Sequence, residues 1–221
     1  HRAMSTLPVV IVGAGGHAAV VADALLAAGR AELGFVDSDP SKVGSHVLGL
    51  PVLGDDSALQ AHGADAIELV NGLGGIGEAS TLRRRAAVQR RLEGEGWHFA
   101  RVLHPAAVVS VHARLNPGCQ VLAGSVVQPL ATIGAGAIVN TRAVVEHDAW
   151  VGAFAHVGPG AVLCGNVRLG TGAHVGAGAT VRQGVTLGDE VVVGIGAAVV
   201  RSCSAGVLVG VPARPKEEGH R

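Results

Sequence analysis

A histidine with acidic neighbours is the first candidate for catalysis in this chain. His147 is followed directly by Asp148 and preceded by Glu146, and His156 lies nine residues further on. A histidine with an ordinary pKa of about 6.5 can take a proton from an attacking group near neutral pH. A carboxylate that accepts from the far ring nitrogen fixes the tautomer and stabilises the imidazolium. His147 is therefore a candidate general base, with Asp148 or Glu146 to orient it.

A glycine-rich turn near the N-terminus is the second candidate site. Residues 13–17 read Gly-Ala-Gly-Gly-His, between an apolar run at 7–12 and an alanine-rich helical stretch at 18–28. A second apolar run at 33–36 ends at Asp37. This order of strand, glycine-rich turn, helix, strand and acidic residue is typical of nucleotide binding. Ala18 stands in place of the third glycine of that pattern, so a structural turn without ligand is the alternative.

A strict six-residue repeat determines how the histidines are positioned. Every sixth residue from Leu103 to Val199 is Ile, Val or Leu, and from residue 131 onward a small apolar residue precedes each by two. A hexapeptide period is typical of a parallel β-helix. Two inward positions fit one short strand, three strands make a coil of about eighteen residues, and coils stack at about 4.8 Å. Glycine often follows the aliphatic residue, where we expect it to supply turn angles closed to other residues.

The repeat also predicts where each histidine points. His147 lies two residues after an inward valine, at a turn, and His156 lies one residue before an inward valine, so both should point outward. A separation of nine residues is half a coil, which places them on different faces. They can share a site only if one comes from a neighbouring subunit. His174 occupies the place of His156 one coil later, and there we expect a solvated histidine.

Length and composition predict two domains and exclude some function classes. We expect an α/β Rossmann-like domain over residues 7–100, a β-helix over 101–203 and a tail over 204–221. With 17 basic and 17 acidic residues, the chain lacks the positive field that holds nucleic acid. No apolar stretch is long enough to cross a membrane. Three isolated cysteines favour a reducing cytoplasm, with Cys119 as a small buried hydrophobe.

The segments between these motifs predict further elements of the first domain. We expect a helix over 57–62 capped by Ser57, strands over 66–70 and 97–102, and a helix over 79–92. That last helix carries five arginines, which we expect on a solvated face. They are Arg83, Arg84, Arg85, Arg90 and Arg91.

Taken together, these motifs resemble the hexapeptide-repeat acyltransferases that modify bacterial sugars. The resemblance is strongest to nucleotide-amino-sugar N-acetyltransferases of the bacillosamine and perosamine type, which share their layout with sialic acid O-acetyltransferases. It extends over residues 7–215 and rests on the glycine-rich turn and on the following motifs: Asn140-Thr141, Val145-Glu146-His147-Asp148, His156-Val157, Gly165-Asn166-Val167 and Gly210-Val211-Pro212-Ala213.

The resemblance implies a left-handed β-helix and a homotrimer with active sites between subunits. It implies direct acetyl transfer from acetyl-CoA to a nucleotide-linked amino sugar, without a metal, with His147 as general base and Asp148 raising its basicity. Backbone N–H groups or His156 are the candidates for stabilising the oxyanion. The residues implied to contact acetyl-CoA are His156, Gly165, Ala177 and Ile195. The residues implied to contact the nucleotide sugar are Gly15, Gly16, His17, Asp37, Ser38 and Gly72.

Three alternatives follow from the same residues. A sugar O-acetyltransferase of the sialic acid type differs only in its acceptor. A β-helix carbonic anhydrase needs three histidine ligands around zinc, and the histidine spacings here do not match that pattern. A scaffold that only binds a nucleotide would not depend on His147. Neither the nucleotide base nor the sugar follows from the sequence.

Overall fold

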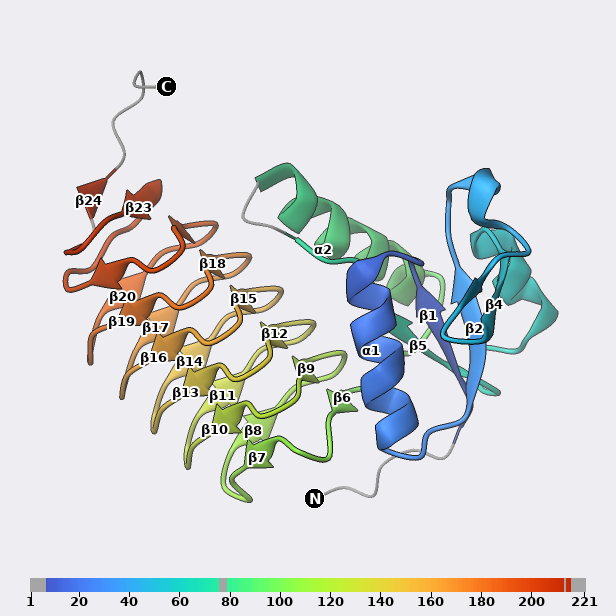
Figure 1. Ribbon diagram of the computed structural model, residues 1–221, viewed down its shortest axis with the longest axis horizontal. Helices are drawn as coiled ribbons and strands as arrows, with labels where there is room; N and C mark the ends of the chain where they lie inside the picture. The colour runs from blue at the N-terminus through green and yellow to red at the C-terminus, as the bar shows by residue number, and fades with distance from the viewer. Residues whose placement is uncertain (1–6, 76–78, 213, 216–221) are drawn as a thin grey trace.

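We describe the protein from a computed structural model, which covers residues 7–75, 79–212 and 214–215. Ala213 of the closing motif and residues 216–221 of the expected tail lie outside these described residues. An α/β domain lies beside one end of a long β-helix, and the helix α2 reaches along the β-helix (Figure 1). Within the described residues, no helix is long and apolar enough to cross a membrane.

The α/β domain is built on a five-stranded sheet in the order β3-β4-β2-β1-β5, with β1 parallel to both of its neighbours. The apolar run at its centre is buried on both sides, as in a doubly wound fold. Its elements are β1 (Val9–Val12), α1 (Gly16–Ala27), β2 (Glu32–Val36), η1 (Pro40–Lys42), β3 (His46–Val47), β4 (Leu50–Gly54), η2 (Asp56–Ala61), β5 (Glu68–Asn71) and α2 (Ala79–Gly94).

Two of the expected elements in this domain differ in detail from the structure. The segment after β4 is a 3₁₀ helix, and Asp55 rather than Ser57 caps it, because the Asp55 carboxylate accepts from the Ser57 backbone N–H at 2.9 Å. The expected strand at 97–102 is broken: Phe99 makes an isolated bridge to Leu69, and Val102 begins the first strand of the β-helix.

The β-helix is a left-handed prism of three sheets, which confirms the predicted fold class, and its strands run parallel except for the last one, which pairs antiparallel. We call these sheets the docking sheet, which faces the α/β domain, the valine sheet and the polar sheet. The docking sheet holds β6 (Val102–Leu103), β9 (Gln120–Val121), β12 (Ile138–Val139), β15 (His156–Val157), β18 (His174–Val175), β21 (Val192–Val193), β23 (Val207–Val209) and β24 (Arg214–Pro215). The valine sheet holds β7 (Val108–Val109), β10 (Val126–Val127), β13 (Val144–Val145), β16 (Val162–Leu163), β19 (Thr180–Val181) and β22 (Ala198–Val199). The polar sheet holds β8 (Arg114–Leu115), β11 (Thr132–Ile133), β14 (Trp150–Val151), β17 (Arg168–Leu169) and β20 (Thr186–Leu187).

The inward rows of the prism form one continuous apolar core of aliphatic and small residues, nearly all fully buried. Residues eighteen apart pair directly, for example His156 with His174. The sheet also continues past residue 204, where we expected a tail, because β23 pairs in parallel with β21.

The turn glycines have a different role from the expected one. Gly152 follows an inward valine but has no left-handed backbone; a Cβ there would lie 2.6 Å from the carbonyl carbon of Gly170 in the next coil. The left-handed position lies two residues further on, where Phe154 (φ 56°) and Gly178 (φ 67°) are examples. The glycines after the aliphatic residues are therefore required by the close approach of stacked coils.

One arginine of α2 was wrongly expected to be solvated. Arg85 is only 1% exposed, and its guanidinium donates to the backbone carbonyls of Gly136 and Phe154 in the β-helix. Burial lowers the pKa of Arg85 to about 9. The other four arginines of this helix are exposed. Arg85 therefore fastens α2 to the β-helix.

The two kinds of glycine predict different costs of adding a methyl group. We expect Gly152→Ala to lower the free energy of unfolding by roughly 3 kcal/mol, because backbone of the next coil must move. Gly178→Ala should cost about 1 kcal/mol, because its Cβ meets nothing within 4 Å and only the left-handed angle is strained. Urea unfolding followed by circular dichroism measures both, and equal losses would contradict the stacking role.

Candidate active site

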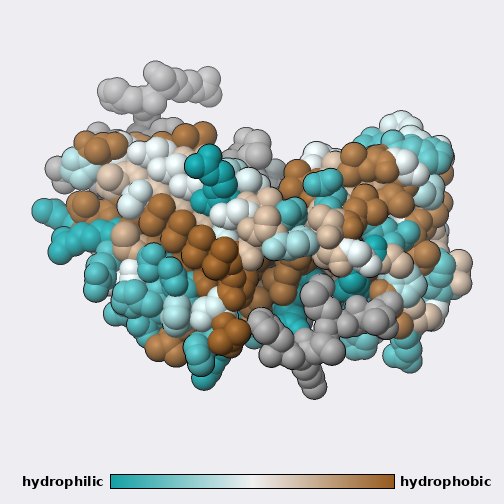
Figure 2. Space-filling model, turned by 60° about the horizontal axis from the view of Figure 1, so that its bottom comes forward, coloured by the Kyte–Doolittle hydropathy of each residue, from teal (hydrophilic) through white to brown (hydrophobic). Residues whose placement is uncertain are grey.

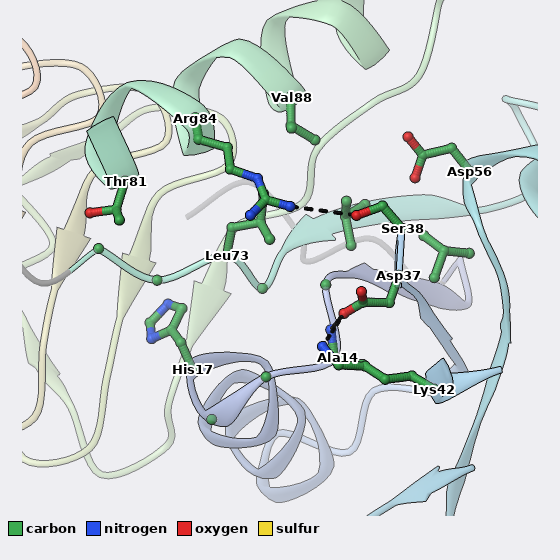
Figure 3. Close-up of a pocket in the computed structure, with 18 residues that line it drawn as sticks. Ala14, His17, Asp37, Ser38, Lys42, Asp56, Leu73, Thr81, Arg84 and Val88 are labelled. Atoms are coloured by element: carbon green, nitrogen blue, oxygen red, sulfur yellow. Dashed lines mark hydrogen bonds and ion pairs between the residues drawn. The ribbon is translucent and has the colours of Figure 1, made fainter. Parts of the chain in front are cut away.

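A cavity of about 430 Å³ opens at the N-terminal end of α1. It is bounded by the carboxyl ends of β1 and β2, by the loop after β5 and by one side of α2 (Figure 3). All six residues predicted to contact the nucleotide sugar line this single cavity: Gly15, Gly16, His17, Asp37, Ser38 and Gly72. Sequence reasoning missed others that line it, among them Lys42, Thr81 and Arg84.

The glycine-rich turn leaves the start of α1 open to a ligand. Gly15 is the N-cap, and no side chain of the described residues caps the helix. The first N–H groups of a helix are donors for an anionic group such as a diphosphate. Gly72 explains how Ala18 replaces the third glycine of the pattern: a Cβ on Gly72 would lie 2.7 Å from the Ala18 Cβ. In this protein the glycine that allows close packing is Gly72, which follows β5, and it does not belong to α1.

Asp37 braces the turn from the neighbouring strand. Its carboxylate accepts from the backbone N–H of Ala14 at 2.7 Å and from Lys42 Nζ at 2.8 Å. Partial burial favours the neutral acid, but these hydrogen bonds, with one from Asp39 N–H, outweigh it and lower the pKa of Asp37. Asp37 is therefore a carboxylate at neutral pH, and it shapes the turn as well as lining the cavity.

His17 lies at the other side of the cavity, toward the β-helix. Its Nε2 is 2.8 Å from Oε1 of Gln120, a residue of β9 that is fully buried. Burial lowers the pKa of His17. Sequence reasoning missed Gln120, although a signal was present: it occupies the same outward repeat position as His156 and His174.

His156 points outward from the prism as expected, but the α/β domain covers it. Its Nδ1 lies 3.1 Å from the carbonyl oxygen of Gly75, which can only accept, so Nδ1 carries the proton. Its Nε2 accepts from Asn140 Nδ2 at 3.0 Å, because Asn140 Oδ1 already accepts from Thr141 N–H. Both nitrogens are thus occupied within the chain, and the expected role as oxyanion donor does not fit this arrangement.

The two histidines of the docking sheet form an edge-to-face pair with ring centroids 4.9 Å apart. Burial, with His174 and Arg85 nearby, lowers the pKa of His156 to about 3. His174 was expected to be solvated but is only 8% exposed, and its ring packs edge to face against His156. Among the described residues, no third His, Cys, Asp or Glu joins them to make a metal site.

His147 stands at the corner between β13 and β14 and is exposed. Its Nδ1 lies 2.8 Å from Asp148 Oδ2, and this pairing singles out Asp148 rather than Glu146 as the orienting carboxylate. Asp148 adopts a left-handed backbone (φ 58°), which asparagine and aspartate tolerate best among residues with a side chain. Gly165 lies one coil further on, where a Cβ would be 2.5 Å from His147 Nε2. The absent side chain of Gly165 therefore makes room for the His147 ring itself.

The remaining predicted acetyl-CoA residues lie at a different corner. Ala177 and Ile195 follow β18 and β21, and the Ala177 carbonyl accepts from the N–H of the residue after Ile195. Ile195 is 84% exposed. One chain thus brings His147 together with Gly165, and Ala177 together with Ile195, but it does not bring His147 to the cavity at α1.

Comparison with known proteins agrees with this architecture. Residues 8–89 match the family model of the PglD N-terminal domain, and residues 148–183 match that of the bacterial transferase hexapeptide with six repeats. A search of curated proteins returned no significant match.

Several solved structures are similar over nearly the whole chain. A histidine-to-asparagine mutant of perosamine N-acetyltransferase from Caulobacter crescentus, in complex with CoA and GDP-perosamine, is 39% identical. It covers 98% of this chain and 100% of its own, with a TM-score of 0.87. The acetyltransferase domain of PglB from Neisseria gonorrhoeae, in complex with acetyl coenzyme A, is 34% identical over 96% of this chain and 100% of its own (TM-score 0.86). This chain belongs to the family of nucleotide-amino-sugar N-acetyltransferases, acetyl-CoA-dependent acyltransferases with a PglD-type N-terminal domain and hexapeptide repeats.

Proposed function

We propose that the protein transfers an acetyl group from acetyl-CoA to the 4-amino group of a nucleotide-linked deoxysugar, with His147 as general base. The hydrogen bond between His147 and Asp148, with the His147 ring packed against Gly165 of the next coil, carries this proposal. The cavity at α1, with its uncapped helix N-terminus, is where we place the nucleotide diphosphate. Relatives that bind GDP-perosamine and CoA support the choice of substrates.

The chain's own groups account for each proton movement. Acetyl-CoA supplies an activated thioester. As the amine nitrogen attacks its carbonyl carbon, His147 Nε2 takes the proton that the nitrogen loses. Asp148 accepts from Nδ1–H and so selects the neutral tautomer whose Nε2 carries the lone pair, and it stabilises the imidazolium afterwards. His147 then returns the proton to the departing thiolate. No serine or cysteine nucleophile is needed, and backbone N–H groups are the donors we assign to the oxyanion.

We propose a homotrimer in which His147 of one chain reaches the substrate held by its neighbour. The separation of His147 from the cavity within one chain supports this arrangement. The valine sheet supplies the contact surface, and Figure 2 shows a hydrophobic stripe running along the β-helix. The outward row of this sheet begins with four valines: Val108, Val126, Val144 and Val162. The free cysteines accord with a reducing compartment, which we propose is the cytoplasm.

Removing the base tests the mechanism. We expect His147→Ala to lower the acetyl-transfer rate by roughly 10²–10⁴, and Asp148→Asn to lower it less. Glu146→Gln is the matched control and should keep the rate near that of the unmodified protein, because Glu146 makes no hydrogen bond to His147. Release of the CoA thiol with GDP-perosamine as acceptor measures all three. A fully active His147→Ala protein would contradict base catalysis; activity toward sialic acid alone would replace the N-acetyl assignment.

The contact between Gly165 and the His147 ring offers an independent test. Gly165→Ala would push on the far end of the exposed His147 ring rather than on backbone, so folding should be little affected. We expect kcat to fall at least about tenfold, because a base displaced by about 1 Å loses its alignment. Calorimetric binding of GDP should not change. An unchanged kcat would contradict the proposal that the position of the His147 ring sets the rate.

Mixed oligomers test the composite site. Gly15→Trp should block the cavity, since the residue lines it and its Cβ would meet nothing within 4 Å, and His147→Ala removes the base. Co-expression of these two inactive chains with different tags, followed by purification of mixed oligomers, should restore part of the activity. Sites formed between an intact cavity and an intact His147 account for the recovery. Mixed oligomers without activity would overturn the intersubunit arrangement.

A further inference from the structure

A series of hydrogen-bonded buried amides crosses the interface between the α/β domain and the β-helix. Asn71 and Gln89 belong to the α/β domain, Gln120 belongs to the β-helix, and all three are at most 1% exposed. Buried amides of this kind are retained only when each polar atom finds a partner, because an unmatched one costs about 1–3 kcal/mol. The amide series ends at His17, inside the cavity that we assign to the nucleotide sugar.

Each hydrogen bond in this amide series has only one possible direction. Gln120 Nε2 lies 2.6 Å from the backbone carbonyl of Asn71, which can only accept, so the amide nitrogen of Gln120 points there. Its oxygen Oε1 must then face His17. An amide oxygen can only accept, so the His17 Nε2, 2.8 Å away, carries a hydrogen.

The neighbouring amides agree with this direction. Asn71 Oδ1 accepts from Leu73 N–H, so its Nδ2 donates to Gln89 Oε1 at 3.2 Å. Gln89 Nε2 in turn donates to the carboxylate of Glu93 at 2.9 Å. A carboxylate at one end and a backbone carbonyl in the middle therefore exclude the flipped orientations of Gln89 and Gln120.

The tautomer decides what His17 offers to a ligand. With the hydrogen on Nε2, the other ring nitrogen, Nδ1, carries a lone pair. The charged or titratable groups near the ring are Arg85 on α2 and His156 on β15, and neither of them stabilises an imidazolium. Burial, reinforced by Arg85, lowers the pKa of His17 against the opposing effect of Gln120, so the ring stays neutral at neutral pH. A neutral Nδ1 repels phosphate oxygens and accepts from a donor.

We propose that Gln120 is a positioning residue for substrate recognition: it holds His17 as the Nε2–H tautomer, so that Nδ1 accepts a hydrogen bond from a hydroxyl or amino group of the sugar. This inference rests on the proposed function. His17 and Thr81 lie at the opposite side of the cavity from Lys42 and Asp56 (Figure 3). The His17 side is also the one in contact with the β-helix, the domain to which we assign acetyl transfer. The sugar therefore lies on the His17 side.

Nuclear magnetic resonance tests the tautomer without any ligand or activity. In protein labelled with ¹⁵N-histidine, His17 is assigned from the signal missing in His17→Phe. We expect nitrogen shifts of the Nε2–H form in the unmodified protein and a shift toward the Nδ1–H form in Gln120→Met. A His17 that is already Nδ1–H, or an even mixture, in the unmodified protein would overturn the proposal.

Binding distinguishes positioning from a merely structural role. Calorimetry with GDP-perosamine and with GDP gives the ratio of the two affinities. We expect Gln120→Met and His17→Phe to weaken GDP-perosamine by about tenfold and GDP hardly at all. His17→Asn, which can place an amide oxygen near the Nδ1 position, should recover part of the loss. Gln89→Met removes a buried amide from the same amide series without touching His17. The ratio of its affinities for GDP-perosamine and GDP should be unchanged.

Equal weakening of GDP and GDP-perosamine in Gln120→Met, or a changed affinity ratio in Gln89→Met, would show that the amides only hold the domains together. That result would overturn the recognition role. If the unmodified protein bound GDP but not GDP-perosamine, the substrate proposed above would be wrong. The tautomer would still be decided by the nuclear magnetic resonance experiment, so the two failures are distinguishable.

Discussion

The structure depends on the spacing at which coils of the β-helix stack. Neighbouring strands lie about 4.8 Å apart, so residues eighteen positions apart must share one place on one face. This forces small residues wherever backbones meet, as at Gly152 against Gly170. It also brings residues of successive coils into direct contact, as with the His147 ring against Gly165 and His156 against His174. The geometry of the candidate site therefore depends on which positions of successive coils carry a large side chain and which carry none.

The α/β domain is attached to this prism through polar groups as well as apolar ones. Arg85 binds two backbone carbonyls at one corner, and Gln120 and His156 bind the two ends of the segment from Asn71 to Gly75. That segment forms one wall of the cavity. Directional bonds of this kind select one relative placement of two domains more strictly than apolar contact does. The wall of the nucleotide cavity is therefore held by the same prism that carries the proposed base.

Much of this arrangement could be predicted from the sequence because the repeat is strictly periodic. The period alone placed His147 at a turn and His156 on another face, and the glycine-rich turn predicted the cavity at α1. The period does not say which face a second domain covers. His156 and His174 were therefore taken as surface residues, and the direction of the buried amides at Gln120 was not foreseen. Arg85 was missed for a similar reason, since nothing in the spacing of arginines on α2 shows which one meets a carbonyl.

Asp148 has a consequence for how such a site can change. Its carboxylate is aimed by a left-handed backbone at a tight corner rather than by surrounding side chains. Half of its side chain is exposed to solvent. The backbone of the corner therefore fixes the orientation of the carboxylate, which in most active sites is fixed by surrounding buried groups. Sequence drift around the corner is then permitted as long as the residue at 148 tolerates that backbone. The backbone conformation thus determines the geometry of the base, and mutation of neighbouring side chains has little effect on it.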